Sequence, residues 1–158
     1  MRLETLAVIF AGMTTHIVKL CVGVDSIEDL EKWQAGRLAA SARENGQPEL
    51  YHRTRMVPKR QDAVLDGGSL YWVIRGVIQV RQRIVALEEG QKDDGTRCCR
   101  IMLHPELVAV RPTPRRAFQG WRYLEGDDAP PDLGRGRGKQ LAEMPAQMRR
   151  ELAELCLI

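Results

Sequence analysis

The residues best suited to chemistry in this chain are the basic and aromatic side chains concentrated in its middle. Between Tyr51 and Leu124, 14 Lys and Arg stand against 7 Asp and Glu, whereas the whole chain of 158 residues has 24 against 21. Cations that follow phosphates and rings on which bases stack are the groups that hold single-stranded nucleic acid. The segment favours a nucleic-acid-binding hypothesis with RNA or another nucleic acid as the partner, because it also holds six of the eight aromatic residues: Tyr51, Tyr71, Trp72, Phe118, Trp121 and Tyr123.

The candidate contacts combine cations with two tryptophans of the predicted strands. An alternative stays open, because strand alternation by itself places tryptophans in a core and arginines on a solvated face. The candidate nucleic-acid-binding residues are Lys59, Arg60, Trp72, Arg75, Arg81, Arg83, Arg115, Arg116, Trp121 and Arg122.

A small-molecule enzyme is the second hypothesis. Its pocket would lie near residues 66–72 and 118–123, with His52 or His104 as the acid or base. Such groups can exchange protons at neutral pH, but no motif requires it. The chain has no G-x-S-x-G elbow, phosphate loop or G-x-G-x-x-G fingerprint. We therefore assign no catalytic residue and expect no cofactor.

The cysteines and histidines do not have the spacing of a metal site. Cys98 and Cys99 are adjacent, so on a strand they point to opposite faces and cannot hold one ion together. No CxxC occurs, and no two histidines are at helical i, i+4 spacing. Buried free thiols in a reducing cytoplasm account for the cysteines, so we expect no metal and a cytoplasmic location.

The N-terminal apolar run is too short for a membrane span. Leu6–Met13 has eight residues, far from the roughly 20 that cross a bilayer. Glu4 precedes it, and no small-residue cleavage pattern follows, so the run also makes a poor signal peptide. We expect no membrane partner.

The elements that must position the candidate residues are one helix and a set of short strands. Ser26, followed three residues later by Asp29, predicts a helix start, and Asn45-Gly46 predicts its end. The long segment Leu70–Leu87 is rich in Val and Ile and predicts strands that break or bulge near Gly76. Its even positions are mostly apolar and its odd positions partly basic, which predicts one core face and one wet face.

These patterns predict an α+β fold. We expect a mainly antiparallel, bent sheet or partial β-barrel, with an N-terminal helix and a C-terminal helix. Residues 14–125 would form a single α+β domain, residues 126–139 a flexible linker rich in Gly and Pro, and residues 140–158 the C-terminal helix. Met148, Leu152 and Leu155 form an apolar stripe on that helix. A homo-oligomeric interaction scaffold, with a homodimer formed through this helix, is therefore the third hypothesis.

The chain contains four distinctive motifs: HIVKLCVG from His16, RTRMVPKR from Arg53, DGGSLYWVIRGVIQVRQ from Asp66 and FQGWRYL from Phe118. Together they resemble one bacterial family, which is known as domain of unknown function 1489. The resemblance covers residues 14–133 and implies no activity, because the family is uncharacterised. A weaker, fold-level likeness is to PUA-like barrels, including the ASCH and EVE domains, which often bind RNA or modified bases; it implies a cleft near Trp72, Arg81 and Trp121.

Overall fold

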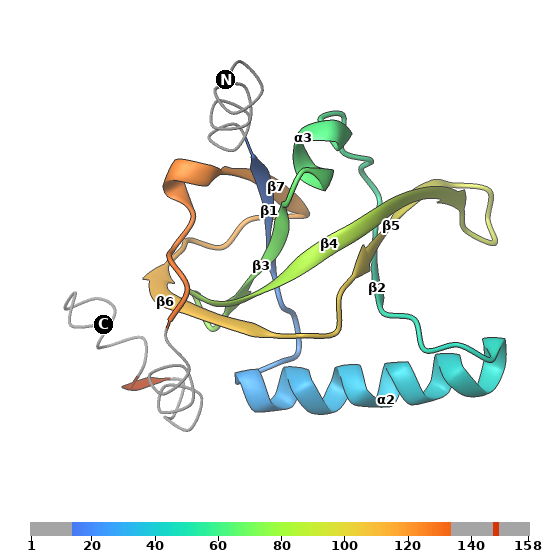
Figure 1. Ribbon diagram of the computed structural model, residues 1–158, viewed down its shortest axis with the longest axis horizontal. Coiled ribbons are helices and arrows are strands. Elements are labelled where there is room, and N and C mark those ends of the chain that lie inside the picture. The colour runs from blue at the N-terminus through green and yellow to red at the C-terminus, as the bar shows by residue number, and fades with distance from the viewer. Residues whose placement is uncertain (1–13, 134–146, 149–158) are drawn as a thin grey trace, which may run out of the picture.

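A strongly bent sheet with one long helix lying across it forms the body of the computed structural model (Figure 1). The structure describes residues 14–133 and 147–148. Its elements in chain order are β1 (Thr15–Leu20), α2 (Ile27–Asn45), β2 (Tyr51–Thr54), α3 (Gln61–Leu65), β3 (Ser69–Ile74), β4 (Val77–Gln91), β5 (Arg97–Leu103), β6 (Val108–Pro114), β7 (Trp121–Glu125) and the 3-10 turn η1 (Gly126–Asp128).

The bend of the sheet follows from the length of β4. In the described part of the chain the strand order is β2-β5-β4-β3-β1-β7, and β6 also pairs with β4. The first half of β4 pairs with β3 and β6, and its second half pairs with β5 after a register shift between Ile84 and Ala86. Among the described strands, β1 and β3 are the one parallel pair. The expected α+β fold with a mainly antiparallel, partial sheet is confirmed.

The predicted N-terminal helix is present with the predicted ends. The Ser26 side chain accepts a hydrogen bond from the backbone N–H of Asp29 at 3.1 Å, which caps the first turn of α2. Gly46 ends the helix in the left-handed conformation, with φ of 78°, and donates its N–H to the carbonyl of Ala42. This conformation favours glycine, so Asn45-Gly46 is the correct stop signal.

Both faces of β3 are buried, which corrects the expectation of one wet, basic face. Leu70, Trp72 and Ile74 belong to a cluster that α2 covers. Tyr71 and Val73 belong to a second cluster on the opposite face, together with β6 and the chain that follows η1. A register shift between Trp72 and Val73 also interrupts the regular alternation that the parity pattern assumes.

Strand β6 includes two prolines. Pro112 and Pro114 are tolerated because β6 pairs with β4 alone among the named strands, and an edge strand can leave backbone N–H groups out of the ladder. An isolated bridge joins Val110 to Asp132 along its other side.

The chain continues on the folded body beyond residue 125, where the sequence predicts a linker over 126–139. Gly126–Asp128 is a 3-10 turn, and Leu133 donates its backbone N–H to the carbonyl of Ala109 at 3.0 Å. Residues 134–139, and the predicted C-terminal helix over 140–158 apart from residues 147–148, lie outside the described residues. Within the part of the chain that the structure describes, no helix combines the length and apolarity that a bilayer crossing needs.

A buried amide network joins α2 to the sheet. The side chains of Gln34 and Gln82 donate to each other reciprocally, at 2.7 and 2.8 Å. The Gln82 carbonyl oxygen also accepts from the indole N–H of Trp72 at 2.8 Å, and its amide nitrogen donates to the backbone carbonyl of His104 at 3.1 Å. Gln82 is completely buried, so these bonds replace all the water that its side chain loses on folding.

We expect Gln82→Met to lower the free energy of unfolding by about 3 kcal/mol, because it leaves buried polar atoms of Gln34, Trp72 and His104 without partners. Urea denaturation of the variant and of the Gln34→Leu/Gln82→Met double variant checks this. The double variant should lose less than the sum of the two single variants, since it removes both partners of the amide pair. A loss below about 1 kcal/mol for Gln82→Met would contradict the network's role.

Candidate functional site

Three of the predicted nucleic-acid-binding arginines are paired with carboxylates. Arg75 forms an ion pair with Asp25, and Arg81 forms a bidentate one with Asp132, at 2.7 and 2.6 Å. The same hydrogen bonds lower the pKa of Asp132. The third pair is Arg60 with Glu125. Each of these guanidinium charges is balanced within the fold, which weakens its attraction for a phosphate.

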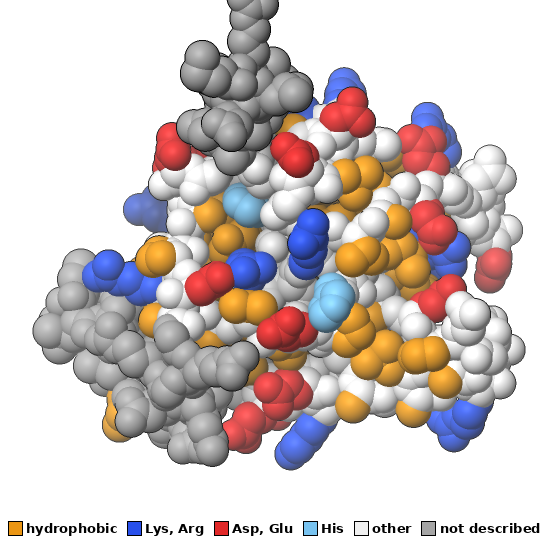
Figure 2. All heavy atoms as spheres, in the orientation of Figure 1, with side chains coloured by type: hydrophobic (Ala, Val, Ile, Leu, Met, Phe, Trp, Pro, Cys, Tyr) orange, Lys and Arg blue, Asp and Glu red, His pale blue; other side chains and the backbone are white. Residues whose placement is uncertain are grey.

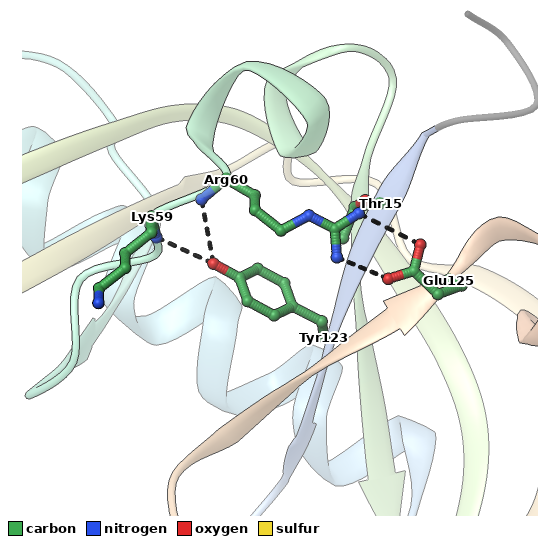
Figure 3. A network of polar contacts seen from close by, with 5 residues as sticks. All are labelled: Thr15, Lys59, Arg60, Tyr123 and Glu125. Atoms are coloured by element: carbon green, nitrogen blue, oxygen red, sulfur yellow. Dashed lines mark hydrogen bonds and ion pairs between the residues drawn. The ribbon is translucent and has the colours of Figure 1, made fainter.

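The Arg60 pair belongs to a network that fixes the loop after β2 (Figure 3). The Tyr123 hydroxyl accepts hydrogen bonds from the backbone N–H groups of Lys59 and Arg60, at 2.9 and 3.1 Å. The Arg60 guanidinium donates to Glu125 at 2.7 Å and to the hydroxyl of Thr15 at 2.6 Å. Strands β1 and β7 therefore hold the loop in place and leave the Lys59 side chain at the surface.

The two predicted tryptophans are both 3% exposed. The indole N–H of Trp72 is bonded to Gln82, and that of Trp121 donates to the backbone carbonyl of Met56 at 2.9 Å. Neither ring offers an open face at the molecular surface, which differs from the position that base stacking there requires. Both tryptophans lie in the core, as the alternative interpretation of the sequence expects.

The other predicted cations do not gather around an exposed tryptophan. Arg115 and Arg122 lie over the Phe118 ring, at 5.5 and 5.4 Å, while Arg83 and Arg116 are exposed elsewhere. Figure 2 shows basic and acidic side chains interspersed on the face it displays, without a continuous basic area. The ten predicted residues are therefore distributed over several parts of the fold.

A different group of cations and rings lies along the edge strand β2. Arg37 of α2 lies over the Trp33 ring at 4.8 Å and over the Tyr51 ring at 5.6 Å, and Arg100 covers Tyr51 at 5.2 Å. Arg53 and Arg100 are register partners, so their side chains share one face of the sheet. Arg55 follows, exposed, at the end of the strand. We call Arg37, Tyr51, Arg53, Arg55 and Arg100 the β2 strip.

The charge of the β2 strip is only partly balanced. Arg100 forms an ion pair with Glu88 at 3.1 Å. Among the described residues, no carboxylate is paired with Arg37, Arg53 or Arg55. The strip continues into an open hollow of about 500 Å³ that the side chains of Arg55, Lys59, Arg97 and Glu89 help to line.

A narrower pocket opens beside the other end of β2, between α2 and the chain that follows β1. Its volume is about 330 Å³, at the lower end of the range for small-ligand sites. Trp33, with 48% of its surface exposed, lies at its rim beside Arg37, and no Asp or Glu lines it among the described residues. The lining residues are Lys19, Leu20, Cys21, Val22, Gly23, Val24, Leu30, Trp33, His52 and Trp72.

His52 is the distinctive polar group of this pocket. Its ring meets Trp72 edge to face, with centroids 5.3 Å apart, and its Nε2 atom is buried without a hydrogen-bond partner. Burial, followed by the positive charges of Lys19 and Arg37, lowers the pKa of His52 to about 4. The imidazole is therefore neutral at physiological pH and has one unused hydrogen-bonding nitrogen in an apolar surrounding.

Burial also shifts the pKa values of Cys21 and Lys19, which line the same pocket as His52. Burial raises the pKa of the Cys21 thiol to about 12, so it is not a thiolate nucleophile at neutral pH. Burial lowers the pKa of Lys19, whose register partner in β3 is Trp72. His104, the other predicted acid or base, is exposed and accepts the backbone N–H of Glu106 at its Nδ1 atom.

Most residues of the strip and pocket were missed as site residues by reasoning from sequence. Trp33 has the spacing of a core residue in the helix, yet it is half exposed. A usable signal exists in the alternation of Tyr51, Arg53 and Arg55 along an extended segment, which places them on one side. Another is Lys19, a charge between the apolar residues Val18 and Leu20 of β1.

A comparison with families identifies the chain. The family model described as "Protein of unknown function (DUF1489)" matches residues 17–158. The chain belongs to this family. The match to DUF1489 extends past residue 133, where the motif resemblance ends, and so includes the predicted C-terminal helix. No curated protein and no solved structure matches the chain, so the likeness to PUA-like domains stays a prediction.

We expect His52 to make this DUF1489 protein less stable in mild acid. The unfolded chain binds a proton near pH 6.5, whereas folded His52 does so only near pH 4, so protons favour unfolding as the pH falls between these values. Between pH 7 and pH 5 the loss from this group is about 2 kcal/mol. Urea denaturation at both values should show that His52→Phe, which keeps a ring against Trp72, lacks this part of the loss. Equal losses in the two proteins would contradict the assignment.

Proposed function

We propose that this protein binds single-stranded nucleic acid, with RNA as the expected partner, along the β2 strip. The observation that supports the proposal is the series of guanidinium groups over aromatic rings, Arg37 between Trp33 and Tyr51 and Arg100 on Tyr51. Cations beside rings at the edge of a sheet are suited to phosphates and unstacked bases respectively. The proposal keeps the partner expected from the sequence and moves the contact surface to β2.

The strip offers its charge at little cost. Arg37, Arg53 and Arg55 have no carboxylate to give up within the described residues, whereas Arg60, Arg75 and Arg81 would have to break existing pairs. Lys59 is the one candidate from the sequence that adjoins the strip, through the hollow that it lines with Arg55 and Arg97. A nucleic-acid strand that runs along β2 would therefore meet positive charge from Arg37 to Lys59.

The acid–base enzyme is less well supported by the pocket. His52 and Trp72 line it, but its other walls are α2 and the chain after β1, not residues 118–123. With a pKa near 4, His52 is a weak base at neutral pH, and among the described residues no carboxylate lines the pocket to orient it. These features suit ligand binding better than proton transfer. The third hypothesis, a scaffold that dimerises through the C-terminal helix, concerns residues that lie outside the described part apart from 147–148.

We expect the Arg53→Gln/Arg55→Gln variant to bind a fluorescein-labelled 12-nucleotide RNA more weakly than the unchanged protein does. Fluorescence anisotropy at salt concentrations from about 50 to 200 mM measures this. Removing two phosphate contacts should reduce the slope of log K against log salt by about 1.4. Both side chains are exposed, so the variant should keep its fold.

The matched control is Arg115→Gln/Arg116→Gln, which removes the same charge from the surface predicted by the sequence alone. It should bind the RNA almost as well as the unchanged protein. The strip is rejected if the control loses affinity and the strip variant does not, and nucleic-acid binding is rejected if the unchanged protein binds neither RNA nor DNA at the lowest salt.

A further inference from the structure

The end of β2 leaves a hollow whose use the β2 strip does not explain. β2 pairs with β5 as far as Thr54, whereas β4 continues beside β5 to the partner of Arg97. The Thr54 hydroxyl donates to the carbonyl of Met56 at 3.0 Å and stabilises the bend with which the chain leaves the sheet. The hollow of about 500 Å³ lies between the loop after β2 and the projecting end of the β4–β5 hairpin (Figure 1).

Three cations and one carboxylate line this hollow. Arg55 and Lys59 belong to the loop, and Arg97 and Glu89 belong to the hairpin. Arg97 and Glu89 form an ion pair at 3.0 Å, but both side chains are more than half exposed, so the pair is weak and costs little to break. Among the described residues, no carboxylate is paired with Arg55 or Lys59. Three cations against one carboxylate leave an excess of two positive charges in the hollow.

The loop that carries Lys59 is fixed by contacts within the fold. The Tyr123 hydroxyl accepts the backbone N–H groups of Lys59 and Arg60, and the Arg60 side chain is tied to β7. Figure 3 shows the Lys59 side chain directed away from this network, on the side opposite to the Arg60 guanidinium. Pro58 is buried and Val57 packs against the core, so the apolar part of the wall is also fixed. A ligand in the hollow therefore meets cations on a preformed backbone, which lowers the entropy cost of binding.

The hollow and the strip lie on opposite faces of the β4–β5 hairpin. Successive residues of a strand point to opposite faces, so Arg97 and Arg100, three residues apart, do not share a face. The ion pairs agree, because Arg100 meets Glu88 and Arg97 meets the next residue, Glu89. A nucleic-acid strand that follows the strip enters the hollow by turning at Arg55, just after the end of β2. The end of such a strand makes this turn more readily than its middle, because nothing beyond the end has to be led out again.

We propose that the hollow binds the phosphorylated end of the nucleic-acid strand held by the β2 strip. A terminal phosphate monoester carries about −1.5 to −2 charges at neutral pH and has three free oxygens. A phosphodiester inside the strand carries about −1. The monoester therefore matches the two excess charges, and its oxygens accept hydrogen bonds from Arg55, Lys59 and Arg97. The inference rests on the proposed function, because the strip supplies the strand.

The size and apolar wall of the hollow suit the terminal nucleotide as a whole. The volume is within the range for small-ligand sites, so the sugar and base can enter with the phosphate. Val57 and Pro58 offer apolar surface on which a sugar or a base face packs. No histidine or cysteine lines the hollow among the described residues, and Glu89 is paired with Arg97, so we assign binding and no chemical step.

The test separates the terminal phosphate from the total charge of the strand. Fluorescence anisotropy compares 12-nucleotide RNAs, labelled on an internal base, that have hydroxyl groups at both ends, a phosphate at the 5′ end or a phosphate at the 3′ end. A longer RNA with hydroxyl ends supplies the same total charge as the phosphorylated strands. We expect at least one phosphorylated strand to bind about tenfold more tightly than this longer RNA. The end that gives the gain assigns the direction of the strand along β2.

The Lys59→Gln/Arg97→Gln variant assigns this gain to the hollow. It removes two of the three cations, so it should bind the phosphorylated strand and the longer RNA about equally. The ratio is measured within each variant, so a general loss of affinity does not enter it. Both side chains are exposed, so the variant should keep its fold. The matched control, Arg115→Gln/Arg116→Gln, removes the same charge from another surface and should keep the tenfold ratio.

Each result decides a different proposition. If the hydroxyl-ended strands bind and neither phosphorylated strand exceeds the longer RNA, the proposal for the hollow is overturned and the β2 strip stands. If the gain persists in Lys59→Gln/Arg97→Gln, the terminal phosphate is bound elsewhere and the proposal for the hollow is overturned as well. If no strand binds at about 50 mM salt, where phosphate contacts are strongest, the proposed function itself fails.

Discussion

The arrangement of the candidate site depends on the buried amide pair between Gln34 and Gln82. The pair fixes the distance between α2 and the bent strand β4, and Gln82 also holds the indole of Trp72. Trp72 in turn sets the place of His52 through their edge-to-face contact. Trp33, the residue before Gln34, is thereby held outside the core at the rim of the pocket. A polar network buried in this way specifies one packing of the helix, because any shift would leave its amides unpaired.

The long strand β4 imposes the second constraint. Its first half pairs with β3 and β6, whereas its second half pairs with β5, which in turn pairs with β2. The sheet therefore bends where β4 changes partners, and β2 is left as an edge strand beside α2. An edge strand with arginines on one side is protected from pairing with another chain, and those same arginines are free to meet a charged ligand.

The sequence predicts local features well and the site poorly. Ser26, Asp29 and Gly46 define the helix ends by short-range chemistry, and the strands of the middle segment follow from their Val and Ile content. The pocket is different, because its walls come from β1, α2, β2 and β3, and the parallel pairing of β1 with β3 that unites them leaves no local signal. The prediction of a wet face on β3 is wrong for the same reason. Its odd positions are buried by β6 and by the chain after η1, and no local pattern in the sequence indicates this contact.

The charge pattern along the chain shows why a basic segment need not form a basic surface. The middle segment has 14 cations and 7 anions, and the segments on both sides are acidic. Folding brings Asp25 from the first segment to Arg75, and Glu125 and Asp132 from the last to Arg60 and Arg81. The arginines of β2 lie on an edge that these flanking carboxylates do not reach, so their charge remains available. Position in the fold, and not density in the sequence, therefore selects the surface on which a polyanion would be bound.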